Sequence, residues 1–257
     1  MIVKPAIAAM LASGLVAPEK PAIILPRPAI VKPESLEVSK HMLLGMPLTM
    51  GMLPGKGPPP TPLVSAYGGH ASNGNNLASY SFASMFIGTA ALDRYVLVYA
   101  HTPSGAPITS VTVGGAATTV LGQDTGNGFF LTNAPVTSGT TATVVISCAT
   151  QALRGAAYTW SVTGRPALTE YMTGTSSSLN VAANGAAFAV CILASGADDA
   201  ATWTGLTERH ESYFDAITNI TAASDSFATA QVSRTLDVTW TAAGNDGNVR
   251  AVSLRPT

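Results

Sequence analysis

The polar side chains that could do chemistry gather in one short stretch: Glu208, Arg209, His210, Glu211 and Asp215. Two carboxylates facing each other across a cleft could hydrolyse a glycosidic bond, because one would act as an acid and the other as a base or nucleophile. The stretch follows Trp203-Thr204-Gly205, which we interpret as a strand end and the start of a loop. A solvated loop or a subunit contact explains the same polar run, so we expect no catalytic site and no enzyme.

Aromatic residues near this stretch leave sugar binding open as an alternative. Trp203, Tyr213 and Phe214 lie close to it in the sequence, and aromatic rings with polar neighbours suit surfaces that are part apolar and part wet. The candidate ligand-binding residues are Trp203, Glu208, His210 and Tyr213. Exposed and aligned rings would favour sugar binding, whereas buried rings would favour a scaffold.

Metal and cofactor motifs are missing from the sequence. The four histidines, His41, His70, His101 and His210, are scattered and show no HxH or HExxH spacing. Asp198-Asp199 lacks the run of spaced Asp and Asn ligands that a calcium loop requires. The chain also has no GxSxG, P-loop or GxGxxG pattern. We therefore expect no metal site and no cofactor.

The two cysteines lie in apolar runs with the character of strands. A buried free cysteine behaves as a small hydrophobe, and we expect that role for Cys148 and Cys191. Their spacing cannot decide whether they form a disulfide. The sequence contains no CxxC or Cys/His cluster, so it does not predict a zinc site.

From Tyr67 onward, short runs of period two alternate with Gly, Asn, Ser and Pro, which is typical of β-strands joined by turns. No long amphipathic helix interrupts them. The sequence therefore predicts an all-β fold, an antiparallel β-sandwich of jelly-roll type, for residues 67–257. The expected strands are Ser79–Ile87, Arg94–Ala100, Ile108–Val113, Ala117–Leu121, Gly128–Thr132, Thr140–Cys148, Ala156–Thr163, Ser178–Ala182, Ala186–Ala194, Ser226–Val232, Thr235–Thr241 and Val249–Leu254.

The pattern within some strands predicts which faces are buried. Tyr158, Trp160 and Val162 should share one face, and Ala186–Ala194 should be buried on both faces because it is apolar throughout. Val113-Gly114-Gly115-Ala116 predicts a tight hairpin.

Residues 1–66 differ sharply from the rest of the chain. They hold twelve of the seventeen prolines and six of the eight methionines, while every Phe, Trp and Tyr lies at or after Tyr67. Proline favours extended backbone at itself and at the preceding residue. Exposed large apolar side chains are unfavourable in water, so we expect an extended anchoring arm with a Pro-rich hinge. The expected anchors are Ile7, Ile23, Ile30, Met42, Leu43, Leu44, Met46, Leu48, Met50, Met52 and Leu53.

Charge limits the classes of partner. Of the 257 residues, 11% are charged, and the net charge is −1. This gives no electrostatic basis for binding nucleic acid or an anionic membrane. The longest apolar run is too short and too interrupted by proline to span a bilayer. Few charges and many small residues instead favour association of identical chains.

Three stretches resemble virion proteins of tailed bacteriophages. They are the hairpin ITSVTVGGAATTVLG from Ile108, the closing region with Trp203–Glu208 and VTWTAAGNDGNVRAVSLRP, and the leader PAIVKPESLEVSKHMLLGMPLTMGM. The resemblance implies a head fibre, collar spike or capsid decoration protein at the surface of the phage particle. It implies that residues 1–66 bind capsid, portal or neck subunits and that the chain forms a homotrimer.

Overall fold

The computed structural model describes residues 60–257 except 103–105, 125–128, 176, 196–197, 215–217 and 242–246. They belong to one compact unit, Gly55–Thr257. The described residues form seventeen strands with antiparallel pairing throughout, which confirms the predicted all-β sandwich. No helix in this part has the length and apolar character needed to cross a membrane. The predicted anchors from Ile7 to Leu53 lie outside the described residues.

The first half of the described chain forms one sandwich of two sheets. Its inner sheet has the order β1-β9-β3-β7-β6 and its outer sheet the order β2-β8-β4-β5. The bounds are β1 (Val64–Asn73), β2 (Leu77–Phe86), β3 (Tyr95–His101), β4 (Ile108–Val113), β5 (Ala116–Ala117), β6 (Thr119–Asp124), β7 (Phe129–Pro135), β8 (Thr141–Ala152) and β9 (Gly155–Thr163).

The second half forms a second sandwich. Its inner sheet has the order β10-β17-β12-β15-β14 and its outer sheet the order β11-β16-β13. The bounds are β10 (Pro166–Gly174), β11 (Ser177–Val181), β12 (Gly185–Ala194), β13 (Ala201–Thr204), β14 (Glu208–Phe214), β15 (Thr218–Phe227), β16 (Gln231–Trp240) and β17 (Asn248–Pro256).

The two sandwiches repeat one topology. The inner sheets correspond strand by strand: β1 to β10, β9 to β17, β3 to β12, β7 to β15 and β6 to β14. The outer sheets correspond in the same way, with β2-β8-β4 matching β11-β16-β13. The order is that of a jelly roll in which one strand, β6 in the first repeat and β14 in the second, pairs at the edge of the inner sheet instead of the outer sheet. The first strand of each repeat carries a β-bulge at the same place, after Tyr67 in β1 and after Leu168 in β10.

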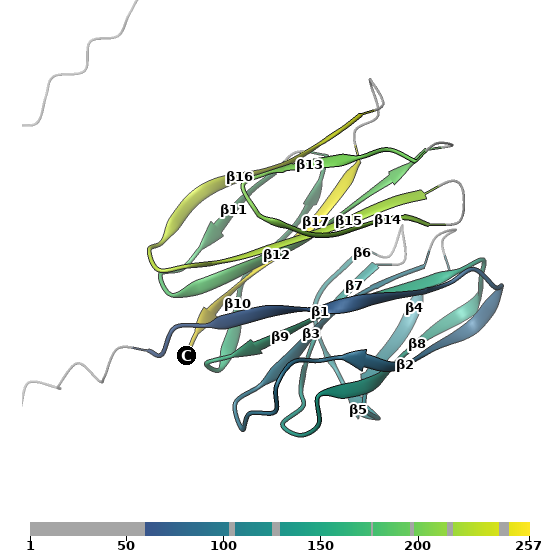
Figure 1. Cartoon of the computed structure of the whole chain (residues 1–257), viewed down its shortest axis with the longest axis horizontal. Coiled ribbons are helices and arrows are strands. Elements are labelled where there is room, and N and C mark those ends of the chain that lie inside the picture. Colours follow the sequence, from purple (N-terminus) through teal and green to yellow (C-terminus); the bar gives the residue numbers. More distant parts are fainter. Residues whose placement is uncertain are drawn as a thin grey trace, which may run out of the picture. The chain divides into compact units, whose positions relative to one another are not determined.

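Four sheets are stacked in the order outer, inner, inner, outer (Figure 1). Three cores fill the spaces between them. The middle core, between the inner sheets, contains Leu97, Tyr99, Tyr158, Trp160, Val162, Phe188, Val190, Ile220, Val252 and Leu254. The core of the first sandwich contains Val96, Val98, Ile108, Val144 and Ile146, and that of the second contains Ala189, Cys191, Leu236, Val238 and Trp240. The central strands are therefore buried on both faces, as predicted for Ala186–Ala194.

The inner sheets pack by corresponding edges. Edge strand β1 contacts β14 and β15, and edge strand β6 contacts β10. Because β10 corresponds to β1 and β14 to β6, the two contacts are equivalent under exchange of the sandwiches. This is the arrangement of a two-fold symmetric dimer, made here within one chain. We call the contact of β1 and the neighbouring Tyr158 with β14 and β15 the seam.

Several expected elements agree with the structure and others do not. The hairpin is confirmed, because Gly114 and Gly115 have φ values of +58° and +80° between β4 and β5. The expected strand Ser226–Val232 is wrong, since the chain turns between β15 and β16 at residues 228–230. That turn contains no Gly or Pro, so its Ala and Thr residues gave no turn signal.

The domain begins earlier than expected. Leu63 is buried in the middle core and β1 starts at Val64, so residues 63–66 belong to the β domain instead of the hinge. Strand β1 contains two glycines and strand β10 starts with a proline. Edge strands tolerate such residues. The sequence pattern treated glycine and proline as turn signals, so it predicted neither β1 nor β10.

Candidate functional site

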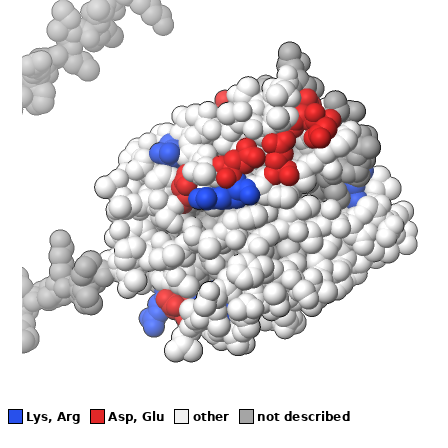
Figure 2. Space-filling model, in the orientation of Figure 1, with Lys and Arg blue, Asp and Glu red and all other residues white. Residues whose placement is uncertain are grey.

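The polar stretch singled out by the sequence is an edge strand instead of a loop. Glu208, His210 and Tyr213 lie on β14, at the edge of the second inner sheet, whereas Trp203 lies on β13 of the outer sheet. Figure 2 shows acidic atoms gathered in one band over this part of the surface, with basic atoms at its border. Glu208, Glu211 and Asp225 belong to this edge of the inner sheet.

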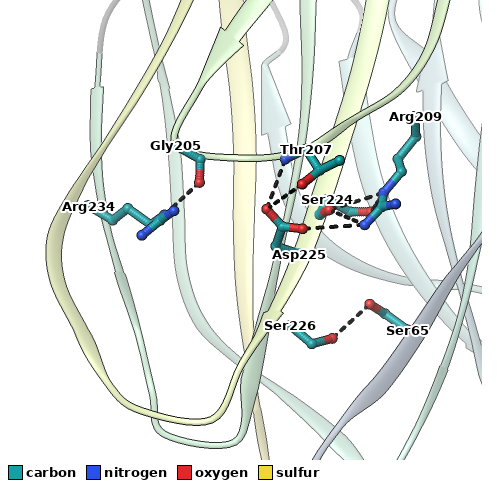
Figure 3. Close-up of polar contacts among 8 residues, drawn as sticks. All are labelled: Ser65, Gly205, Thr207, Arg209, Ser224, Asp225, Ser226 and Arg234. Carbon is teal, nitrogen blue, oxygen red and sulfur yellow. Dashed lines mark hydrogen bonds and ion pairs between the residues drawn. The ribbon is translucent and has the colours of Figure 1, made fainter.

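Arginine and aspartate side chains hold the edge strand in place. The Arg209 guanidinium donates to the backbone oxygen of Ser224 at 2.8 Å and to Asp225 Oδ1 at 3.3 Å. The backbone N–H of Thr207 donates to Asp225 Oδ2 at 2.8 Å (Figure 3). The ion pair is partly exposed, so it contributes at most about 1 kcal/mol. The network fixes β14 to β15, and both carboxylate oxygens of Asp225 accept hydrogen bonds within it.

The side chains of β14 alternate between two faces of the sheet. Glu211 Oε2 accepts a hydrogen bond from the Ala201 N–H at 3.1 Å, toward the outer sheet. His210 points the other way and stacks on His70 and Tyr67 of the first sandwich. Burial, and secondarily Glu211, raises the pKa of Glu208.

Trp203 packs on the core of the second sandwich, away from His210. Its indole Nε1 donates to Thr221 Oγ1 at 2.8 Å, and Thr221 Oγ1 donates to the backbone oxygen of His210 at 3.1 Å. The Trp203 ring and the His210 ring therefore lie on opposite faces of the inner sheet. The four candidate ligand-binding residues do not form one pocket.

The exposure of the aromatic side chains tests the sugar-binding alternative. Trp203 and Tyr213 are half-buried, and Phe86 is the one exposed aromatic side chain among those whose burial the structure describes. A groove of about 430 Å³ opens at another place, beside Leu92 and Arg165, and no candidate residue lines it. The described rings therefore do not form the exposed, aligned set that was expected of a sugar-binding surface.

The seam holds the group of side chains that the sequence did not reveal. The His70 and His210 rings stack with centroids 4.8 Å apart, and His70 lies 4.6 Å from the Tyr158 ring. Tyr67 packs edge-on against Trp160 at 5.7 Å. His70 and His210 are far apart in the chain, and neither sits in a motif, so only the packing of β1 against β14 brings them together.

Burial keeps these imidazoles neutral. The pKa of His70 is lowered to about 4, by burial first and by the nearby His210 second. Burial also lowers the pKa of His210, although Glu211 acts in the opposite direction. In the described part of the chain, Nε2 of each ring is buried and has no hydrogen-bond partner. A charge at either ring would therefore be poorly stabilised.

Other candidate groups serve local structure. Asp199 is buried and accepts hydrogen bonds from Ser195 Oγ at 2.8 Å and Thr241 Oγ1 at 3.2 Å. Cys148 and Cys191 are both free thiols, and Cys191 lies in the core of the second sandwich. The described residues contain no group of three or more His, Cys, Asp or Glu placed to hold a metal ion.

Comparison with known proteins gives no relative. No family model matches the chain, and no curated protein or solved structure is detectably similar to it.

Proposed function

We propose that the chain is a non-enzymatic structural protein of a tailed-bacteriophage particle, anchored by the residues that precede Leu63 and displaying its double β-sandwich at the virion surface. The observation that carries this proposal is the change in the chain at Leu63. Before it come apolar anchors among prolines without an aromatic residue. After it come four stacked sheets whose buried and half-buried polar groups link one strand to another.

The geometry of the acidic band supports a structural role. Glu208 and Glu211 lie on the same strand, and Glu211 accepts a backbone N–H. A glycoside hydrolase needs two carboxylates on opposite sides of a bound sugar. Sugar binding is the weaker proposal, because Trp203 and Tyr213 are half-buried and Trp203 uses its N–H within the fold.

Removal of the anchor tests the proposal. A chain that begins at Gly55 keeps Leu63 and the whole of β1, so it should fold as the β domain. We expect it to be soluble and to show the far-UV circular dichroism of a β protein, but to be absent from particles assembled with the other virion components. A control with Met42, Met46, Met50 and Met52 replaced by leucine keeps the apolar character and should be incorporated. Incorporation of the shortened chain at the level of the full chain would refute the anchor.

A further inference from the structure

The seam joins two bodies that are covalently linked by two residues. Gly164 and Arg165 connect β9 to β10, and both have positive φ, +97° and +54°. All other contact between the sandwiches is noncovalent. The seam can therefore open at its edge while each sandwich keeps its own strand pairing and its own core.

Polar contacts at the seam are few and weak. Ser65 Oγ and Ser226 Oγ lie 3.0 Å apart (Figure 3). Tyr158 Oη and Ser212 Oγ lie 3.5 Å apart. The rest of the edge is closed by ring contacts centred on the two histidines. The closed seam thus depends on the imidazoles staying uncharged.

We propose that His70 and His210 form an acid-responsive latch, which holds β1 against β14 at neutral pH and releases this edge when the imidazoles become protonated. Protonation of His70 would place a charge on a buried ring whose Nε2 has no hydrogen-bond partner, and protonation of both rings would add repulsion at a ring separation of 4.8 Å. The middle core beyond the edge is large and apolar, so we expect the release to be local.

The groups around the latch make His70 the histidine whose protonation the closed seam opposes more strongly. Besides His70 and His210, the titratable side chains on the packed strands are Tyr67 on β1, Tyr80 on β2, Tyr158 on β9, Glu208, Arg209, Glu211 and Tyr213 on β14, and Asp225 on β15. Arg209 and Asp225 bind each other and Glu211 binds the Ala201 N–H. Glu211 favours protonation of His210, whereas burial and His210 oppose protonation of His70.

The direction of the pH effect follows from these values. His70 has a pKa of about 4 in the closed seam, and an exposed histidine has a pKa of about 6.5. The open seam therefore binds the proton more tightly. Opening is unaffected above about pH 6.5, increases as the pH falls toward 4, and levels off below it. At pH 5 the ratio of open to closed seam should rise about 20-fold relative to pH 7.

A distance measurement on the full chain tests the latch. Spin labels on Ala66→Cys in β1 and Thr202→Cys in β13, both exposed positions, report the separation of the sandwiches by pulsed electron paramagnetic resonance in a Cys148→Ser background. We expect one short distance at pH 7 and a growing longer population between pH 6 and 4. In His70→Phe/His210→Phe the rings still pack but cannot titrate, so the short distance should persist.

Two controls isolate the latch from general acid sensitivity. Tyr67→Phe keeps the seam ring and removes a group that does not titrate in this range, and His41→Gln removes a histidine outside the β domain. Both should behave as the unsubstituted chain. Unchanged distances down to pH 4, or equal opening in the double variant, would overturn the proposal. If the double variant does not fold, ring ¹⁵N titration of the unsubstituted chain decides, because a His70 pKa near 6.5 with the seam closed also overturns it.

Discussion

One buried cation shows how single residues define the first sandwich. Arg94 is fully buried and lies immediately before β3. Its guanidinium donates to four backbone oxygens at 2.7–2.9 Å, those of Gly88, Val136, Ser138 and Gly139. A planar fork with five N–H donors can serve several acceptors at once. Arg94 thereby ties the loop before β3 to the loop after β7.

Substitution of Arg94 should be costly. Arg94→Ala leaves buried carbonyl groups without donors, and we expect the free energy of unfolding to fall by at least about 3 kcal/mol. Arg94→Lys keeps the charge but not the fork, so its loss should be smaller. Urea unfolding followed by circular dichroism measures both. The matched control is Arg255→Ala, at an exposed position, with an expected change within about 0.5 kcal/mol. An equal effect of the Arg94 and Arg255 variants would contradict this role.

Residue types alone identified candidates but not their orientation. Glu208, His210 and Trp203 were visible as polar or aromatic residues close in sequence. Which of them face one another depends on the alternation of β14 and on the sheet that Trp203 joins. His70 could not be linked to His210 at all, because the contact requires two edge strands from different sandwiches.

At the scale of elements, strands that are continuous apolar runs were predictable, whereas the edge strands β1, β10 and β14 and the buried strand β15 were not. Strands such as Tyr95–His101 and Gly185–Ala194 are buried on both faces and appear in the sequence as continuous apolar runs. Edge strand β14 is polar on one face and borders water, so its sequence resembles a loop. The hairpin at Gly114-Gly115 was predictable because its backbone requires positive φ at both positions.

The repetition of elements is hidden because topology is kept while core side chains differ. The pair Leu97 and Trp160 in the first inner sheet corresponds to Ala186 and Leu254 in the second. Both pairs fill the middle core. The two pairs differ in volume, so neighbouring side chains must fill the remaining space differently in the two halves of the core. A search for repeated letters would therefore miss the duplication that the strand order reveals.

The contact of β6 with β10 is closely packed at Gly122 and Tyr171. A Cβ atom on Gly122 would lie 2.2–2.4 Å from ring atoms of Tyr171. We expect Gly122→Ala to lower the free energy of unfolding by about 1–3 kcal/mol through overpacking. Tyr171→Ala in the same chain removes the clash, so the double variant should lose less than the two single losses combined.

Thermal and urea unfolding of the four chains measure this coupling. Gly74→Ala is the control, since a Cβ atom there meets nothing within 4 Å. Simple additivity of the Gly122 and Tyr171 effects would show that the close approach of β6 and β10 is not realised in solution.

At the scale of the whole molecule, the face drawn in Figure 2 carries few charges outside the acidic band and its border. Large apolar side chains are exposed at separate places, with Leu92 at 95%, Val232 at 83% and Val64 at 65% exposure. Scattered exposed apolar residues are common on proteins, but with 11% charged residues there is little to oppose association. Closed rotational symmetry is the usual way in which identical chains bury such surface.

The proposed homotrimer can be tested on the full chain and on a chain that begins at Gly55. Light scattering coupled to size-exclusion chromatography should give three times the chain mass of 26.2 kDa for the full chain. If the β domains associate through their apolar side chains, Leu92→Glu and Val232→Glu should weaken the oligomer of the shortened chain, because each places a charge in a dehydrated contact. Thr239→Glu, at another exposed position, is the matched control. A monomer at micromolar concentration for both chains would refute the trimer. The anchor would remain as an independent proposal, because three linked arms strengthen attachment but one arm suffices for it.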